Sequence, residues 1–81
     1  MAYFIYILEC NDGTLYTGIT TDVERRLDEH NHSDKGAKYT KLRRPVRLVY
    51  KELSKDRSSA SKREYAIKKL SRNEKLELID A

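Results

Sequence analysis

The feature that most constrains the fold is a pair of apolar and aromatic runs with a turn signal between them. Residues 3–8 read YFIYIL, residues 14–19 read TLYTGI, and Asn-Asp-Gly occupies positions 11–13. Short runs rich in Tyr and Ile that are joined by Asn, Asp and Gly are typical of a β-hairpin. The first run lacks polar alternation, which favours a strand covered on both faces. The sequence therefore predicts an antiparallel pair at the start of the chain.

The length of the turn decides which side chains share a face. A two-residue Asp-Gly turn would place Tyr6 and Tyr16 on opposite faces of the hairpin. A three-residue loop, with Gly13 in the left-handed conformation, would instead pair Tyr6 with Gly18 and put Tyr16 on the same face, one pair further along. The residues of the turn permit both arrangements.

A helix is predicted to begin near Asp22, because Thr21 and Glu24 have the spacing of a capping box. One face of this helix, at helical spacing, carries two apolar and two polar residues: Val23, Leu27, Arg26 and His30. An arginine and a histidine are thus expected on the side that faces the sheet. Residues 32–45 show no clear periodicity and end at Pro45, so we expect a loop there.

A third strand is predicted over residues 46–53, which alternate and are rich in Val, Leu and Tyr. Residues 56–70 predict a helix whose buried stripe holds Ala60, Ile67 and Leu70, with Glu64 at its border. Tyr65 should point away from that stripe. The last helix should follow Ser71 as its N-cap and use Leu76 and Ile79 for packing: Glu74 stands at the capping-box position.

The expected fold class is therefore α+β, a three-stranded antiparallel sheet with flanking helices in the order β-β-α-β-α-α. The 81 residues predict one domain over positions 1–81. The N-terminus lacks the features of a signal peptide, and no apolar run is long enough for a membrane span. The single cysteine, Cys10, excludes an internal disulfide. We expect a cytoplasmic protein.

The positive charge of the chain is concentrated in one segment. The formal net charge is +4, yet between positions 35 and 47 there is no acidic residue. A localised basic segment is the electrostatic footprint of a nucleic-acid binder, although a solvated loop is the simpler interpretation of such a run. The basic side chains of the segment are Lys35, Lys38, Lys41, Arg43, Arg44 and Arg47.

The pattern directs five polar side chains inward or onto the sheet: Tyr6, Tyr16, Arg26, His30 and Glu64. Each alone has a structural explanation, such as an aromatic core residue or a surface ion pair. Together they place an acid, a base and a positive charge in a small core, which is the usual signature of a site. A carboxylate that anchors Mg²⁺, an arginine that holds a phosphate and a tyrosine or histidine that moves a proton would suit phosphodiester cleavage.

At the level of motifs, the sequence resembles the GIY-YIG nuclease superfamily. The likeness rests on FIYIL, LYTGIT, DVERRLDEHN and KREYAIKKL in that order, and runs from about position 3 to position 70. It is greatest to the small, single-domain bacterial branch, and the chain is also similar to the catalytic module of nucleases that cut branched DNA. The first motif here reads Phe-Ile-Tyr, with Phe4 where the family name has glycine.

The resemblance implies a metal-dependent endonuclease. The two motif tyrosines fall on Tyr6 and Tyr16, the phosphate-binding arginine on Arg26, the helix histidine on His30 and the metal-binding glutamate on Glu64. One Mg²⁺ or Mn²⁺ ion is expected on Glu64. Tyr6 is assigned as the base toward water, and Tyr16 as the residue that orients water or phosphate. Placing both tyrosines in one cleft requires the three-residue loop of the hairpin.

The expected partner is DNA, with branched or damaged DNA in repair as one candidate and RNA as a second substrate to test. Contacts to it are assigned to Gly18, Lys35, Lys38, Lys41, Arg43 and Arg44. Many superfamily members carry a separate targeting domain, for which 81 residues leave no room, so another protein is a candidate source of target specificity. The alternative hypothesis is a nucleic-acid-binding module that keeps the nuclease fold without catalysis. A third treats the five polar side chains as packing and surface pairs.

Overall fold

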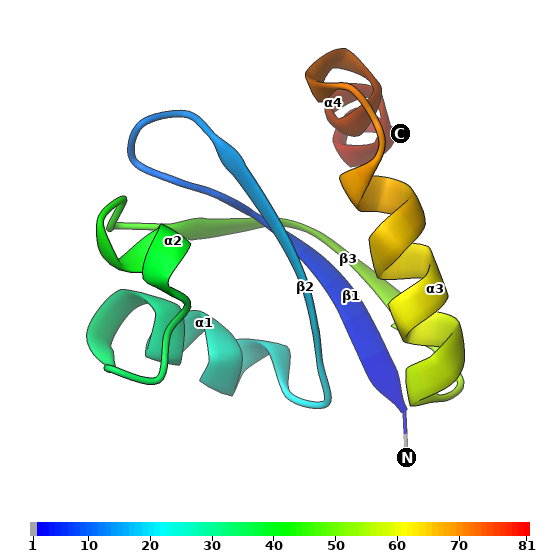
Figure 1. The fold of residues 1–81 in the computed structure, drawn as a ribbon, viewed down its shortest axis with the longest axis horizontal. Helices are drawn as coiled ribbons and strands as arrows, with labels where there is room; N and C mark the ends of the chain where they lie inside the picture. Colours follow the sequence, from blue (N-terminus) through cyan, green and yellow to red (C-terminus); the bar gives the residue numbers. More distant parts are fainter. Residues whose placement is uncertain (1) are drawn as a thin grey trace.

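The computed structural model describes residues 2–81 and contains a sheet with helices on both of its faces (Figure 1). In chain order the elements are β1 (Tyr3–Glu9), β2 (Leu15–Thr20), α1 (Val23–His32), α2 (Lys38–Lys41), β3 (Arg47–Ser54), α3 (Arg57–Lys68) and α4 (Arg72–Asp80). The predicted α+β fold is confirmed. The short helix α2 is an addition that the sequence did not predict.

The sheet is antiparallel with the strand order β2-β1-β3, so β1 is its central strand. The hairpin uses the three-residue loop. Gly13 has φ of +83°, its N–H donates to the carbonyl of Cys10, and the Cys10 N–H donates to the carbonyl of Thr14. Tyr6 consequently pairs with Gly18, and the arrangement that places the two tyrosines on one face is the one that forms.

Successive side chains of β1 enter two different cores, because strand side chains alternate between faces. Ile5 and Ile7 pack with Ala60 and Ile67 of α3. The other cluster contains Tyr6, Leu8, Cys10 and Val46, and partly buried side chains of β2 and α1 pack against it. The absence of polar alternation in the first run is explained by this burial on both faces, as predicted.

Two predictions about the segment after the hairpin are wrong. Asp22, and not Thr21, is the N-cap of α1: its carboxylate accepts the Arg25 N–H at 3.1 Å, and the backbone of Asp22 donates to the Thr20 hydroxyl. A carboxylate at this position both satisfies a free N–H and carries negative charge at the positive end of the helix. The expected loop over residues 32–45 contains the single helical turn α2.

The C-terminal helices follow the predicted pattern except at one position of α4, where Leu78, and not the predicted Leu76, packs with Ile79 against the core. Ser71 and Glu74 form the complete capping box of α4. Ala60 and Ile67 are fully buried, Leu70 is half-buried, and Tyr65 is exposed. No helix within residues 2–81 combines the length and the apolar character needed to cross a membrane.

Candidate active site

The centre of the candidate site is a hydrogen bond between two buried side chains. The hydroxyl of Tyr6, on the central strand, lies 2.8 Å from Nε2 of His30, on α1. Tyr6 is 2 % exposed and His30 is fully buried. The helical spacing that put His30 on the inner face of α1, and the strand parity that put Tyr6 on the same side of the sheet, bring these groups together.

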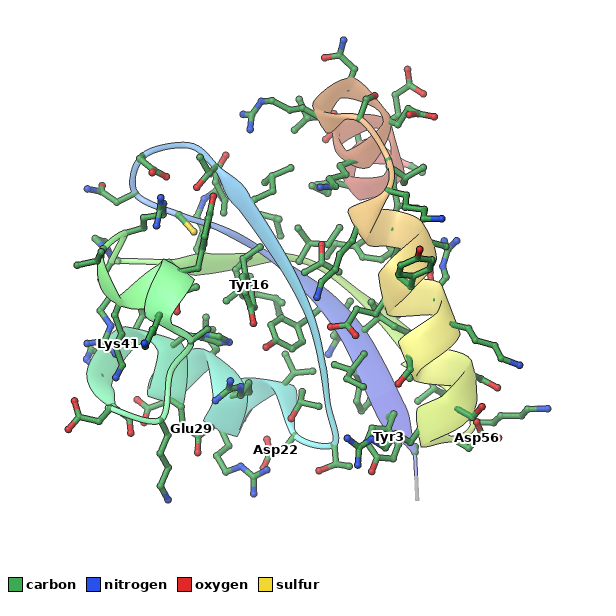
Figure 2. The ribbon with its side chains drawn as sticks, viewed as in Figure 1. Tyr3, Tyr16, Asp22, Glu29, Lys41 and Asp56 are labelled. Carbon is green, nitrogen blue, oxygen red and sulfur yellow. The ribbon has the colours of Figure 1, made fainter. Side chains whose placement is uncertain are left out.

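Tyr16 extends this cluster toward the surface. Its ring centroid lies 6.5 Å from that of Tyr6 and 5.1 Å from that of His30, in an edge-on arrangement with the imidazole. The ring of Tyr39, from α2, stacks on Tyr16 at 6.0 Å. Figure 2 shows Tyr16 pointing to the side of the sheet that α1 and α2 cover. Within residues 2–81 the Tyr16 hydroxyl has no hydrogen-bond partner, so it is free for a ligand.

Burial keeps both members of the central pair neutral at pH 7. Burial raises the pKa of Tyr6 to about 12; the neighbouring Tyr16 and Glu64 add to the rise, and Arg26 opposes it. The pKa of His30 is lowered to about 4, mainly by burial and in part by the positive charges of Arg26 and Arg44. Desolvation disfavours the charged form of each group, which is an anion for tyrosine and a cation for histidine. The pair therefore holds its proton on the phenol.

Arg26 lies beside this pair with part of its guanidinium in use. Its Nη1 donates to Glu29 at 3.0 Å and to the carbonyl of Lys35 at 2.8 Å. These two contacts fix the side chain, which is 25 % exposed. These two contacts leave Nε and Nη2 unused, and the guanidinium also lies close enough to the Tyr6 hydroxyl to lower its pKa.

Glu64 lies in the helical layer on the other face of the sheet, and within residues 2–81 its one ion pair is to Lys68. It lies on α3, which packs against β1 and β2, and its negative charge acts on the Tyr6 hydroxyl. Its carboxylate is 23 % exposed, and its ion pair to Lys68, at 3.3 Å, is accessible to solvent. Such a pair is weak enough to be exchanged for a cation.

The donor set fits a divalent ion of the Mg²⁺ type held mainly by substrate and water. Within residues 2–81 no group of three or more His, Cys, Asp or Glu side chains could hold a metal ion. Mg²⁺ is commonly bound by one or two carboxylates while phosphate and waters fill its remaining positions. Glu64 would be the protein ligand that the family resemblance implies.

Two arginines of the basic segment have structural roles. Arg44 donates to three carbonyls at the end of α1, those of His30, Glu29 and Ser33, at 2.5, 3.3 and 2.6 Å. Arg43 pairs with Asp12 at 3.0 Å. Satisfying the last carbonyls of a helix with a cation stabilises the helix end. These two arginines thus hold the fold together.

The remaining basic residues of the segment differ in whether their side chains form an ion pair. Arg47 pairs with Glu9 at 2.6 Å. The side chains of Lys35, Lys38 and Lys41 form no ion pair within the described chain; Lys38 and Lys41 lie on α2, and Lys35 lies in the turn between α1 and α2. The lysines are therefore the members that stay available for a nucleic acid.

Two further contacts border the site. Arg43 covers the ring of Tyr39, with 3.9 Å from its Cζ to the ring centroid. Gly18 lies directly against the Tyr6 ring, so its backbone is part of the wall around the phenol.

Sequence reasoning missed Thr40, a fully buried residue of α2. Its hydroxyl lies 2.8 Å from Nδ1 of His30. A threonine in a segment without apolar periodicity gives no signal of burial. Only the packing of α2 against α1 places it inside.

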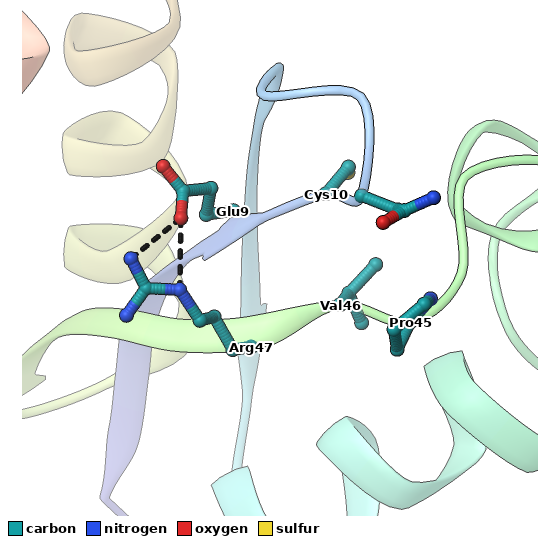
Figure 3. A pocket seen from close by; sticks show the side chains of 6 residues that line it. Glu9, Cys10, Pro45, Val46 and Arg47 are labelled. Atoms are coloured by element: carbon teal, nitrogen blue, oxygen red, sulfur yellow. Dashed lines mark hydrogen bonds and ion pairs between the residues drawn. The ribbon is translucent and has the colours of Figure 1, made fainter.

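A cavity of about 260 Å³ lies at the hairpin end of the sheet (Figure 3). It is lined by Glu9, Cys10, Asn11, Pro45, Val46 and Arg47, and contains none of the five candidate site residues. The candidate site lies apart from this cavity, and its partly exposed members are Tyr16, Arg26 and Glu64.

Comparison with known proteins gives a consistent result. The model of the GIY-YIG catalytic domain matches residues 2–77. The chain is 64% identical over 80 residues to UPF0213 protein DP2720 of Desulfotalea psychrophila, covering 99% of this chain and 73% of that protein.

Two solution NMR structures share the fold. UPF0213 protein BH0048 from Bacillus halodurans has a TM-score of 0.63 at 49% identity. Protein EF2693 from E. faecalis has a TM-score of 0.68 at 46% identity. Each likeness covers 99% of this chain and 84% of the other. The match over nearly all of the chain, together with the tyrosine pair, shows that the protein belongs to the GIY-YIG family and is similar to the UPF0213 proteins of bacteria.

Proposed function

We propose that the protein is a divalent-metal-dependent endonuclease that hydrolyses phosphodiester bonds in DNA. The observation that carries the proposal is the neutral, hydrogen-bonded pair of Tyr6 and His30, with Arg26 and Glu64 both close enough to act on the Tyr6 hydroxyl. A proton acceptor, a phosphate-binding cation and a carboxylate that can hold a metal ion are the groups that phosphodiester hydrolysis needs. Membership of the GIY-YIG family supports the same class of reaction.

In this mechanism Tyr6 is the base. As water attacks the phosphorus, its proton passes to the Tyr6 oxygen while the Tyr6 proton passes to Nε2 of His30, 2.8 Å away. The bond from phosphorus to the leaving oxygen breaks, and that oxygen takes a proton from solvent. Glu64 would hold the divalent cation, whose positive charge would lower the cost of removing a proton from the attacking water.

The other site residues bind and orient the substrate. Arg26 would use Nε and Nη2 for two phosphate oxygens and offset the charge that develops on them. The free hydroxyl of Tyr16 would orient the water or the phosphate. The lysines at positions 35, 38 and 41 would hold the DNA backbone, each adding to the salt dependence of binding.

The test is cleavage of nicked, flapped and forked DNA with Mg²⁺ or Mn²⁺. We expect Glu64→Gln and Arg26→Gln to lower the rate by roughly 100-fold or more, because each removes charge stabilisation at the phosphate. Glu77→Gln, at an exposed position of α4, is the matched control and should cleave like the parent. Parental rates in all variants would show that the assigned site is wrong.

A binding measurement separates the enzyme from a non-catalytic module. The endonuclease predicts DNA binding whose salt slope falls by about one for each lysine replaced by Met at position 35, 38 or 41. Salt-sensitive binding with no cleavage of any of the three substrates would support the module instead.

A further inference from the structure

Thr40 connects His30 to the backbone of α2. The Thr40 hydroxyl lies 2.8 Å from Nδ1 of His30 and 2.9 Å from the carbonyl oxygen of Ala37, and Thr40 is fully buried. A neutral histidine carries one ring proton, on either Nδ1 or Nε2, and the partners of the ring decide which. Here both ring nitrogens have a partner at 2.8 Å: Thr40 on one side and Tyr6 on the other.

The direction of the hydrogen bonds is set at the Thr40 end by a carbonyl. A carbonyl oxygen can only accept, and a hydroxyl has a single proton. When Thr40 donates that proton to the Ala37 carbonyl, its oxygen can only accept from His30. This direction places the imidazole proton on Nδ1 and leaves a lone pair on Nε2.

The hydrogen bond between Tyr6 and His30 indicates the same tautomer, with Tyr6 as the donor and Nε2 as the acceptor. Within residues 2–81 the Tyr6 hydroxyl has one hydrogen-bond partner, Nε2 of His30. Arg26 is near enough to act on this hydroxyl, but a guanidinium cannot accept a hydrogen bond. Nε2 is thus the acceptor that the chain offers to the buried Tyr6 proton, and a proton on Nε2 would leave that donor unsatisfied, which is costly.

We propose that Thr40 is a positioning residue that fixes the tautomer of His30, so that a bare Nε2 faces Tyr6 and can take its proton. The consequence for cleavage rests on the proposed function, whereas the tautomer itself does not. In the opposite tautomer Nε2 would carry a proton and would donate to the Tyr6 oxygen. His30 could then accept nothing from Tyr6, and Tyr6 could not act as a base through it. Thr40 touches neither water nor phosphate in this mechanism.

The experiment compares Thr40→Val, Thr40→Ala and Thr40→Ser with the parent. Thr40→Val keeps the shape of the side chain and removes the hydroxyl, while Thr40→Ser keeps the hydroxyl. Thr17→Val is the matched control, a buried threonine on β2 that pairs with Ile7 and not with the site. The tautomer is read from the ¹⁵N resonances of the His30 ring, and cleavage and DNA binding are measured on the same proteins.

We expect the parent, Thr40→Ser and Thr17→Val to hold the ring proton on Nδ1. Thr40→Val and Thr40→Ala should shift the ring toward the Nε2–H tautomer and lower cleavage by roughly 100-fold, the low end of what a general base contributes, with DNA binding unchanged. Parental behaviour of the serine variant would exclude a purely steric role.

Two results would overturn the proposal. One is an Nε2–H tautomer in the parent, which is decisive even if the valine and alanine variants do not fold. The other is an unchanged Nδ1–H tautomer in both of those variants. Absence of cleavage in every protein would contradict the proposed nuclease function and leave the tautomer measurement as the test of Thr40.

Discussion

At the scale of single residues, the Tyr6 ring occupies the space that a side chain at position 18 would need. A Cβ built on Gly18 would lie 2.5 Å from the Tyr6 hydroxyl oxygen and 2.7 Å from its Cζ. Tyr6 lies across the strand pair at this point, because Gly18 is its direct partner on β2. Glycine is thus required for a steric reason: it leaves room for the phenol to reach His30.

We expect Gly18→Ala to displace the Tyr6 ring and weaken its bond to His30. The free energy of unfolding should fall by about 1–3 kcal/mol, as is usual for an overpacked core. Urea unfolding measures this loss, and the NMR resonances of the His30 ring report the lost contact.

Gly13→Ala provides the matched control. The φ of Gly13 is +83°, and no atom lies within 4 Å of the position that a Cβ would take there. Alanine at this position should cost about 1 kcal/mol in backbone strain without touching the site. The His30 resonances should keep their parental positions in this variant. Unperturbed His30 resonances in Gly18→Ala would contradict the steric role.

At the scale of elements, α3 is fixed to the sheet by a polar cluster one residue before Glu64. Arg63 donates to both carboxylate oxygens of Glu52 on β3, at 2.8 and 3.1 Å, and the Tyr50 hydroxyl donates to Glu52 at 2.5 Å. A bidentate pair of this kind fixes direction as well as distance. It restrains the turn of α3 that carries Glu64.

Arg63→Gln tests this restraint. Because the pair is partly exposed, with side-chain exposures of 41% and 28%, we expect a stability loss of about 1 kcal/mol or less. The cleavage rate should fall by roughly 10-fold, which is more than the small loss of stability would explain, since small displacements of a reacting group are costly. Urea unfolding and cleavage rates on the same preparation compare the two effects.

The neighbouring Lys62→Gln is the control for Arg63→Gln. Lys62 is exposed and forms no ion pair in the described chain, so the stability and the cleavage rate of Lys62→Gln should match those of the parent. An Arg63→Gln protein that cleaves at the parental rate would show that the position of Glu64 does not depend on β3.

At the scale of the whole molecule, burial of His30 links stability to pH. The ordinary pKa of 6.5 applies to the unfolded chain, and burial lowers the folded value to about 4. Between these values the unfolded chain binds the extra proton and the folded protein does not. The contribution of His30 to stability is therefore complete above pH 6.5 and is lost as the pH falls toward 4.

We expect the free energy of unfolding to fall by about 3 kcal/mol across this range through His30. His30→Gln should remove that part of the slope, and His32→Gln, at an exposed position, should keep it. Urea unfolding at a series of pH values measures all three proteins. A His30→Gln protein with the parental slope would assign the pH dependence to other groups.

Much of the fold follows from short-range pattern. The hairpin turn at Gly13, the inner face of α1 with His30 and the capping box at Ser71 were all predicted, since each depends on residues within about one or two helical turns. The position of the α1 cap was wrong by one residue, because both Thr21 and Asp22 are good cap residues and the backbone conformation favours the second.

The sequence by itself determined which chemical groups this protein could bring to one place. Strand parity and helical spacing are geometric properties of the backbone, so they direct Tyr6, Tyr16 and His30 to one side of the sheet once the three-residue turn forms. The tertiary structure alone decided how those groups are connected. Arg44 donates its hydrogen bonds to carbonyls at the end of α1. Thr40 is buried against His30 because helices α1 and α2 pack together. Hydrogen-bond direction depends on partners distant in the chain, and no local pattern encodes them.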